Sequence, residues 1–247
     1  MFSPAEKLST SLQTHFDQLI SRYAPNLSKD RRYAQWQIIS EYYNAPHRHY
    51  HTLRHVAFLL NEWQKYQSQL IDADMVALAI YYHDIIYEPL RKDNEHQSAQ
   101  FFADNFAHLL SPQQIQVVVS LIEMTAKHSL EIPQITAKHS LEIPQIDDKT
   151  EAVLYSSIQQ FKVDAALFLD MDLAILGMPW GQYEAYAKAV RLEYIQIEST
   201  QYQQGRKQVL QRLLSKPYLY FTSSYRQSHE QQARQNINQE MQLLASM

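Results

Sequence analysis

The 247-residue sequence has no cysteine and only three glycines. Without cysteine the chain can form neither disulfides nor thiolate sites, so a metal site would consist of nitrogen and oxygen ligands. Sheet proteins use glycine at turns, bulges and hairpins, so its scarcity favours helices joined by short polar loops. The sequence also lacks a secretory signal and any apolar run as long as a membrane span. We therefore expect a cytoplasmic, helical protein.

Strong charge of either sign is missing too. The net charge is −4, which gives no electrostatic reason to expect a nucleic-acid partner. The length allows one large domain or two small ones, but no segment is long and flexible enough to act as a linker. We expect a single domain over residues 1–247 and no membrane partner, while assembly into a homo-oligomer stays open.

Apolar residues recur at intervals of three and four along most of the chain, which is typical of amphipathic helices. The pattern predicts helices over 5–23, 30–43, 51–67, 73–87, 94–110, 112–126, 149–176, 180–196, 199–215 and 224–245. Ser111-Pro112 has the residues of a helix cap and first turn. These features together predict an all-α fold.

One segment interrupts this pattern, because residues 125–135 recur unchanged as residues 136–146. A single tandem copy is not a repeat architecture, which needs several longer units. Eleven residues are close to three helical turns, but Pro133 and Pro144 favour a loop, and loops tolerate added length. We interpret 136–146 as a surface insertion rather than a functional device. Because His128 keeps its spacing to the preceding helix, we expect it, rather than His139, to line a pocket.

Histidines and aspartates recur at spacings that suit a metal site. On a helix His51 and His55 would share a face, and His83-Asp84 offers a nitrogen and an oxygen ligand. Histidines with carboxylates suit a divalent transition metal, which can activate water. A histidine pair on the surface or in the core is the alternative, but a metal-dependent hydrolase is our leading hypothesis.

A fourth ligand has two candidates, Asp170 and Asp172, within the apolar segment 167–176. A carboxylate in such surroundings needs a partner, and a metal ion would be one. On a helix the two side chains point about 200° apart, so they should not share one ion. A helix cap or a salt bridge to Arg191 is the alternative role for either aspartate.

The order of these residues resembles that of the HD-domain metal-dependent phosphohydrolase superfamily, a helical fold in which H…HD…D binds a divalent cation. Further short motifs resemble a bacterial branch of predicted HD phosphohydrolases, and the resemblance covers residues 48–240 with the duplication as the departure. The motifs are Tyr50-His51-x-x-x-His55, His83-Asp84-Ile85-Ile86-Tyr87, Asp93-Asn94-Glu95-x-x-Ser98-Ala99, Asp170-x-Asp172-Leu173-Ala174-Ile175-Leu176-Gly177, Arg191-x-Glu193-Tyr194, Gly205-Arg206 and Ala233-Arg234-x-Asn236. The resemblance implies a single-domain HD-type helical bundle, but it does not specify a substrate.

The segment from Tyr50 to His55 is also similar to the Tyr-His-Asn-x-x-His motif of cyclic-nucleotide phosphodiesterases. In that motif the second histidine binds metal and the first protonates the leaving oxygen. The resemblance thus implies that His55 is a ligand and His51 the general acid. Thr52 replaces the asparagine and the second-metal region has no clear match, so specificity for cyclic nucleotides does not follow.

The ligand set that the resemblance implies is His55, His83, Asp84 and Asp172. Asp172 is preferred to Asp170 because the Ala-Asp-Leu around the last ligand of relatives aligns best with residues 171–173. The set would hold one divalent ion, and manganese, iron, zinc, nickel and magnesium all suit such mixed ligands.

Polar residues near these motifs are candidates for substrate contacts. We expect Arg48, Asn94 and His128 to bind substrate, and Glu95 to orient water or a ligand histidine. A first-turn glutamate that favours the helix dipole is the alternative for Glu95. The expected reaction is hydrolysis of a small-molecule phosphoester, with nucleotides among the candidates. A non-catalytic metal- or nucleotide-binding regulatory module is the alternative, and a purely structural role would leave the His-Asp pattern unexplained.

Overall fold

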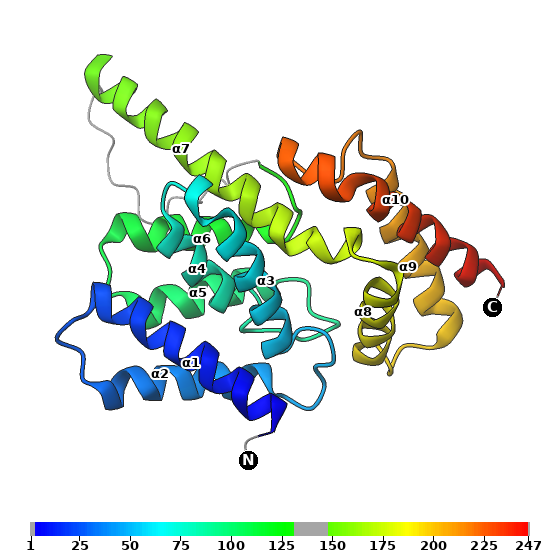
Figure 1. Cartoon of the computed structure of the whole chain (residues 1–247), viewed down its shortest axis with the longest axis horizontal. Helices are drawn as coiled ribbons and strands as arrows, with labels where there is room; N and C mark the ends of the chain where they lie inside the picture. The colour runs from blue at the N-terminus through cyan, green and yellow to red at the C-terminus, as the bar shows by residue number, and fades with distance from the viewer. Residues whose placement is uncertain (1–2, 131–147, 247) are drawn as a thin grey trace.

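The computed structural model describes residues 3–130 and 148–246. Within these ranges the chain forms ten α-helices, two short 3₁₀-helices and no strand, so the predicted all-α fold is confirmed (Figure 1). The helices are α1 Pro4–Tyr23, α2 Lys29–Tyr43, α3 Leu53–Tyr66, η1 Gln67–Gln69, α4 Ala73–Tyr82, α5 Asn94–Phe106, α6 Pro112–Thr125, α7 Asp148–Leu173, η2 Ala174–Gly177, α8 Trp180–Glu193, α9 Ser199–Leu214 and α10 Ser223–Ser246.

Local sequence determines where several helices begin. At the start of α6 the Ser111 hydroxyl accepts a hydrogen bond from the Gln114 amide, and the Gln114 side chain accepts one from Ser111. Such a reciprocal pair satisfies two donors that the first helical turn leaves free, and a proline follows as the first helical residue. The predicted cap at Ser111-Pro112 is thus confirmed. Ser3 and Glu6 form the same reciprocal pair at the start of α1.

The core is organised around α4, whose residues from Met75 to Tyr82 are all buried. This helix packs against α3, α5, α6 and α7, which explains why its sequence is apolar on every side. Buried apolar residues form one cluster that extends from Leu12 in α1 to Ile237 in α10. None of the described helices combines the length and apolar character that a membrane-spanning helix needs.

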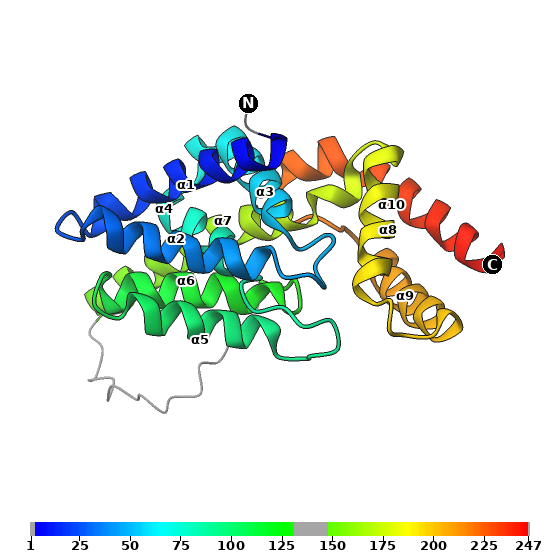
Figure 2. The ribbon, with the colours of Figure 1, turned by 90° about the horizontal axis from the view of Figure 1, so that it is seen from below.

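Helices α8, α9 and α10 gather at one end of the molecule, and α1 to α6 gather at the other (Figures 1 and 2). The junction depends on a close approach between η2 and α10. A Cβ atom at Gly177 would lie 2.6 Å from the His229 Cβ, so only glycine fits there. The Asn236 amide then donates to the carbonyl oxygens of Leu176 and Met178, at 2.8 and 2.7 Å. These contacts join α10 to η2, which directly follows α7, the helix that carries Asp172.

Two predicted helices differ from the structure at the residues of greatest interest. The helix predicted over 51–67 begins only at Leu53, because the preceding Thr52 is its N-cap. His51 therefore lies before the helix, and its expected place on one helical face with His55 is wrong. The helix predicted over 73–87 ends at Tyr82, so Asp84 lies in a turn and not within a helix.

The remaining boundaries agree with the prediction to within four residues, the largest difference being α5, which ends at Phe106 instead of residue 110. The second copy of the duplicated segment, 136–146, lies outside the described residues, as does the end of the first copy. The expected surface insertion therefore stays a prediction.

Candidate functional site

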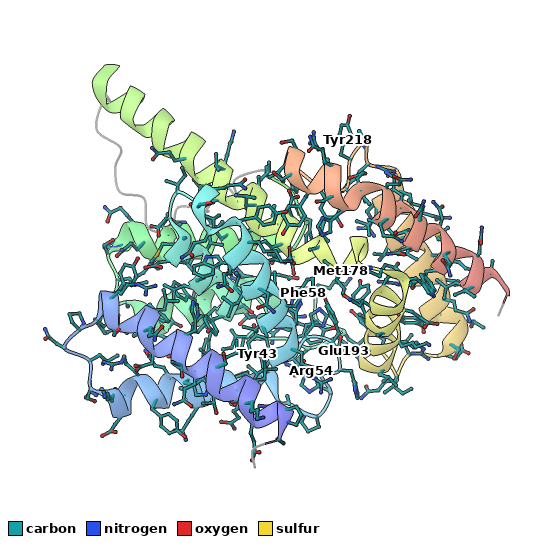
Figure 3. The ribbon with its side chains drawn as sticks, in the orientation of Figure 1. Tyr43, Arg54, Phe58, Met178, Glu193 and Tyr218 are labelled. Atoms are coloured by element: carbon teal, nitrogen blue, oxygen red, sulfur yellow. The ribbon has the colours of Figure 1, made fainter. Side chains whose placement is uncertain are left out.

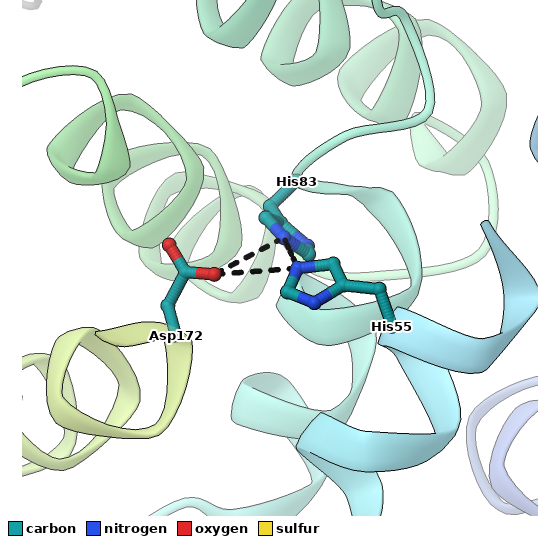
Figure 4. A group of neighbouring side chains, drawn as sticks. All are labelled: His55, His83 and Asp172. Atoms are coloured by element: carbon teal, nitrogen blue, oxygen red, sulfur yellow. Dashed lines mark hydrogen bonds and ion pairs between the residues drawn. The ribbon is translucent and has the colours of Figure 1, made fainter. Parts of the chain in front are cut away.

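Three helices bring His55, His83 and Asp172 together (Figure 4). His55 lies in the first turn of α3, His83 follows the last residue of α4, and Asp172 lies near the end of α7. The two histidine Nε2 atoms are 3.1 Å apart, and Asp172 Oδ1 lies 3.3 Å from the first and 3.7 Å from the second. One ligand atom from each residue lies within 4.8 Å of the others, so this group could hold a metal ion.

Asp84 approaches the same two nitrogen atoms. Its Oδ2 lies 3.0 Å from Nε2 of His83 and 3.6 Å from Nε2 of His55. Ligand atoms that surround one transition-metal ion at about 2.1 Å are themselves about 3.0–3.4 Å apart. The separations of each carboxylate oxygen from the two imidazole nitrogens are close to that range, so Asp84 lies where it could join the His55, His83 and Asp172 group at one ion.

The charges of the cluster also suit a cation. His83 Nδ1 donates to the Ile80 carbonyl oxygen at 3.0 Å, which leaves Nε2 of the neutral ring with its lone pair toward the cluster. His55 is 3% exposed, and its Nδ1 has no hydrogen-bond partner among the described residues. With neutral imidazoles, Asp84 and Asp172 give the site a formal charge of −2, which one divalent cation would balance.

Interactions within the cluster also shift the pKa values of its members. Burial disfavours the His83 imidazolium, but the charge and hydrogen bond of Asp84 outweigh burial and raise the pKa of His83 to about 9. Burial likewise opposes ionisation of Asp172, yet hydrogen bonds from His128 and His55 hold its pKa well below the usual range. Metal ligands must be deprotonated to bind, so a bound cation would displace the proton that the raised pKa favours on His83.

Asp170, the alternative ligand, lies outside this cluster. Its carboxylate accepts hydrogen bonds from the Phe221 amide at 2.7 Å, the Thr222 amide at 2.8 Å and the Thr222 hydroxyl at 2.6 Å. Asp170 thus holds the segment that precedes α10, much as a helix cap does. Burial is the main reason that the pKa of this carboxyl rises to about 6. Arg191, the alternative salt-bridge partner of the two aspartates, donates to the carbonyl oxygens of Tyr194 and Ile197.

His128 lies beside the cluster, just beyond the end of α6. Its Nε2 is 2.8 Å from Asp172 Oδ2, the carboxylate oxygen that faces away from the histidine ligands. Its backbone φ of 44° is the single positive value among the described non-glycine residues. Such a conformation is uncommon for a residue with a side chain, and it often marks a functional position.

His51 is held by a carboxylate from the other end of the molecule, Glu193, the last residue of α8. Figure 3 labels Glu193 at the end of α8. Glu193 Oε1 accepts hydrogen bonds from the backbone amides of His49, Tyr50 and His51, at 2.7–2.9 Å. Its Oε2 lies 2.8 Å from His51 Nδ1 and also accepts from the Tyr87 hydroxyl at 3.0 Å.

This network changes the pKa values of both partners. Burial opposes ionisation of Glu193, but the hydrogen bond and charge of His51 outweigh it and lower the pKa of Glu193 to about 2. For His51, burial favours the neutral ring, whereas the charges of Asp84 and Glu193 raise its pKa overall. The sequence motifs contained Glu193, but no local pattern indicated that it would reach His51.

Two other predicted contact residues have different surroundings from those we expected. The buried Arg48 guanidinium donates to the carbonyl oxygens of His51, Asp84 and Ile85, at 2.7–3.1 Å. It therefore ties the His51 segment to the turn that carries Asp84. The Asn94 side-chain oxygen accepts a hydrogen bond from the Glu88 backbone amide, and its nitrogen donates to the Glu88 carbonyl oxygen. Neither side chain lines the cavity beside the cluster, which suggests that each positions the site instead of contacting substrate.

A cavity of about 720 Å³ adjoins the cluster. At one end it is lined by His51, Glu95, His128 and Asp172, and its other wall comes from α8 and α9. Burial raises the pKa of Glu95, whose carboxyl group faces this space. The arrangement therefore joins a potential metal site to an acid–base pair and to room for a small molecule.

Comparison with protein-family models gave no match, and comparison with curated proteins gave none either. The resemblance to HD-domain phosphohydrolases thus stays a prediction from the sequence motifs. Any function assigned to the chain must be supported by the geometry of the site and its chemistry.

Proposed function

We propose that this protein is a metal-dependent phosphohydrolase that cleaves a phosphoester of a small molecule. The observation that carries the proposal is the convergence of His55, His83, Asp84 and Asp172 beside a cavity that Asp172 lines. A divalent cation held by these four residues would lower the pKa of a water molecule and offset charge on the phosphoryl group. Manganese, iron, zinc, nickel and magnesium all remain candidates for that ion.

Hydrolysis needs a proton for the departing alcohol, and His51 has the surroundings to provide it. Glu193 holds Nδ1 of the ring, so Nε2 is the nitrogen available to the cavity that His51 lines. Because the carboxylate stabilises the imidazolium, His51 can carry a proton to the leaving oxygen near neutral pH. We therefore assign His51 as the general acid and Glu193 as the residue that positions it.

Two further residues at this end of the cavity would act on water and phosphate. Glu95 lines the same cavity as Asp172, and its carboxylate would orient the attacking water. His128 is anchored to Asp172 Oδ2 and presents a ring edge to the same space, where it can hydrogen-bond a phosphoryl oxygen. These roles retain the expectations for Glu95 and His128.

The experiment is to strip metal from the purified protein, restore manganese, and measure release of phosphate or alcohol from phosphomonoesters, nucleotides and cyclic nucleotides. We expect hydrolysis of at least one class that disappears on chelation and in Asp172→Ala. The matched control is Asp170→Ala, which removes a carboxylate two residues away that does not join the cluster. Bound metal without hydrolysis of any ester would contradict the proposal and favour a regulatory binding module.

A further inference from the structure

The cavity beside the metal cluster extends far beyond the reacting end. Its volume of about 720 Å³ falls in the range of sites that enclose a whole small organic molecule, roughly 300–1,000 Å³. One end carries His51 and Asp172, and the other is formed by side chains of α8 and α9. A substrate bound here would place its phosphate at the cluster and its organic group against α8 and α9.

Aromatic and aliphatic side chains form most of the wall away from the cluster. Five tyrosines border the cavity: Tyr50, Tyr87, Tyr186, Tyr194 and Tyr202. Tyr50 and Tyr186 pack edge to face with ring centroids 4.6 Å apart, and Tyr194 and Tyr202 lie 6.0 Å apart. Rings fixed in this way offer flat apolar surfaces at little cost in side-chain entropy, which suits a planar organic group.

The same wall offers little to a highly charged group. Arg206 is the single lysine or arginine among the lining residues that the structure describes, and it is buried. Its Nε and one terminal nitrogen donate to the Glu240 carboxylate at 2.8 and 3.0 Å. Because Glu240 balances that charge, no lining lysine or arginine is left to neutralise a second or third phosphate.

The hydroxyl group of Tyr50 is an independent indication of a ligand. It is buried and has no hydrogen-bond partner among the described residues. Its ring lies 4.8 Å from that of His55 and 4.6 Å from that of Tyr186, between the metal cluster and the tyrosines of α8. A buried hydroxyl without a partner is costly, and an ester or phosphoryl oxygen of a substrate would satisfy it.

We propose, resting on the phosphohydrolase function above, that the substrate is a phosphate ester with a single phosphate and an uncharged, flat aromatic group. The aromatic group binds among the tyrosines of α8 and α9, and the Tyr50 hydroxyl donates to an oxygen of the ester. Leu90 and Val209, which are 63% and 42% exposed, extend the apolar surface at the edge of the cavity.

The first test varies the organic group while the reacting bond stays nearly constant. Ethyl, benzyl and 2-naphthylmethyl phosphate all release a primary alcohol, so differences in kcat/KM report binding of the organic group. We expect kcat/KM to rise about tenfold or more from the ethyl to the naphthylmethyl ester. A nucleoside monophosphate should be hydrolysed at least as well as its triphosphate. Equal kcat/KM values for the three esters, or faster hydrolysis of the triphosphate than of the monophosphate, would overturn the proposal.

The second test separates this proposal from the phosphohydrolase function. Calorimetry of the metal-free protein with 2-naphthylmethanol and with adenosine measures binding of the organic group without turnover. We expect one saturable site for which the two aromatic compounds compete. The compound that binds more tightly shows which type of ring the wall selects. If no ester is hydrolysed but this site exists, the proposed function fails and the aromatic site stands. If esters are hydrolysed and neither compound binds, the aromatic site fails alone.

The third test fills the cavity. Gly205 in α9 borders it, and a Cβ atom there would meet no atom within 4 Å. Gly181 in α8 is equally open but does not line the cavity, so it is the matched control. We expect Gly205→Trp to raise KM for the naphthylmethyl ester about tenfold and to leave KM for the ethyl ester unchanged. Gly181→Trp should change neither, and equal effects of the two variants would contradict the proposal.

Discussion

The two walls of the cavity have different origins. Beside one end, the imidazole nitrogens of His55 and His83 lie 3.0–3.7 Å from each other and from carboxylate oxygens of Asp84 and Asp172, and Asp172 lines the cavity. The opposite wall, from α8 and α9, is mostly tyrosine and aliphatic residues, and its cation Arg206 is paired with Glu240. Ionisable groups therefore characterise the first wall, and apolar and aromatic side chains characterise the second. Under the proposed function, the chemistry would belong to the first wall and the fit of the organic group to the second.

Glu193 is the exception to this division, because it belongs to α8 but holds His51 at the reacting end. Its two carboxylate oxygens accept five hydrogen bonds, four of them from the segment 49–51. Changes at the charged wall should thus remove metal or turnover, and changes at Glu193 should alter the orientation of His51 while the metal stays bound.

The largest effect should come from Asp172. We expect Asp172→Ala to reduce both bound metal and turnover to background, because it removes an anionic ligand atom within 3.7 Å of both histidines. Asp170→Ala should retain the metal and lower the free energy of unfolding by about 2–4 kcal/mol, since it leaves buried donors at Phe221 and Thr222 unpaired. Elemental analysis and urea denaturation measure the two quantities. Retention of metal by Asp172→Ala would reverse the assignment.

His51→Ala should have the next largest effect. We expect turnover to fall about a hundredfold with the metal retained, which is the scale of a lost general acid. Esters with poor leaving groups should suffer most, because nitrophenolate departs without a proton. Rates for alkyl and nitrophenyl phosphates, measured beside the metal content, test this role. An equal loss for both esters would rule out proton donation by His51.

Glu193→Gln should act more weakly on turnover but distinctly on acid stability. We expect a rate decrease of about tenfold with normal metal content, because the imidazolium of His51 loses its anionic partner. The pKa of Glu193 is lowered from 4.5 to about 2, so its ionised form stabilises the fold above pH 4.5, and this stabilisation is lost as the pH falls toward 2. Its size is on the order of 3 kcal/mol.

The difference in unfolding free energy between wild type and Glu193→Gln should therefore shrink as the pH is lowered from 6 to 3. Urea denaturation at several pH values measures it. Glu184→Gln, which changes an exposed carboxylate on the same helix, is the control and should show little dependence on pH. A difference that stays constant across this range would mean that the Glu193 carboxyl is not ionised in the way we describe.

The smallest effect should follow deletion of residues 136–146. The first copy of the duplicated segment provides His128, which already contacts Asp172. Loops tolerate changes of length at low cost, so we expect unchanged metal content and turnover, and a stability change within about 1 kcal/mol. Metal analysis, kinetics and thermal unfolding of the deletion variant check this. A large loss in any of them would show that the second copy contributes to the site or to an assembly.

Sequence pattern predicted the helices because the period of their apolar residues reflects burial on one face. It placed the start of α3 wrongly because the cap at Thr52 was missed, and the end of α4 wrongly because a side chain distant in sequence satisfies the backbone there. Arg48 donates to the carbonyl oxygens of Asp84 and Ile85, which allows the chain to leave the helix after Tyr82. The period of apolar residues in the sequence does not reveal that contact.

The candidate metal ligands could be found from sequence because a histidine or a buried aspartate has few roles and the motifs are short. The partners of those ligands could not, because they depend on tertiary packing. Glu193 lies 142 positions from His51, and no local pattern indicates the contact. The resemblance already favoured Asp172 over Asp170, but only the structure shows that Asp170 bonds to the segment before α10.

Under the proposed function, two histidines and two aspartates bind one divalent cation. Pulsed electron paramagnetic resonance of the metal-stripped protein, titrated with manganese, tests it directly, because couplings to nitrogen identify imidazole ligands. We predict one equivalent of bound manganese with couplings from two imidazole nitrogens, reduced to one in His55→Ala. Manganese that fails to bind, or binds without nitrogen couplings, would contradict the claim.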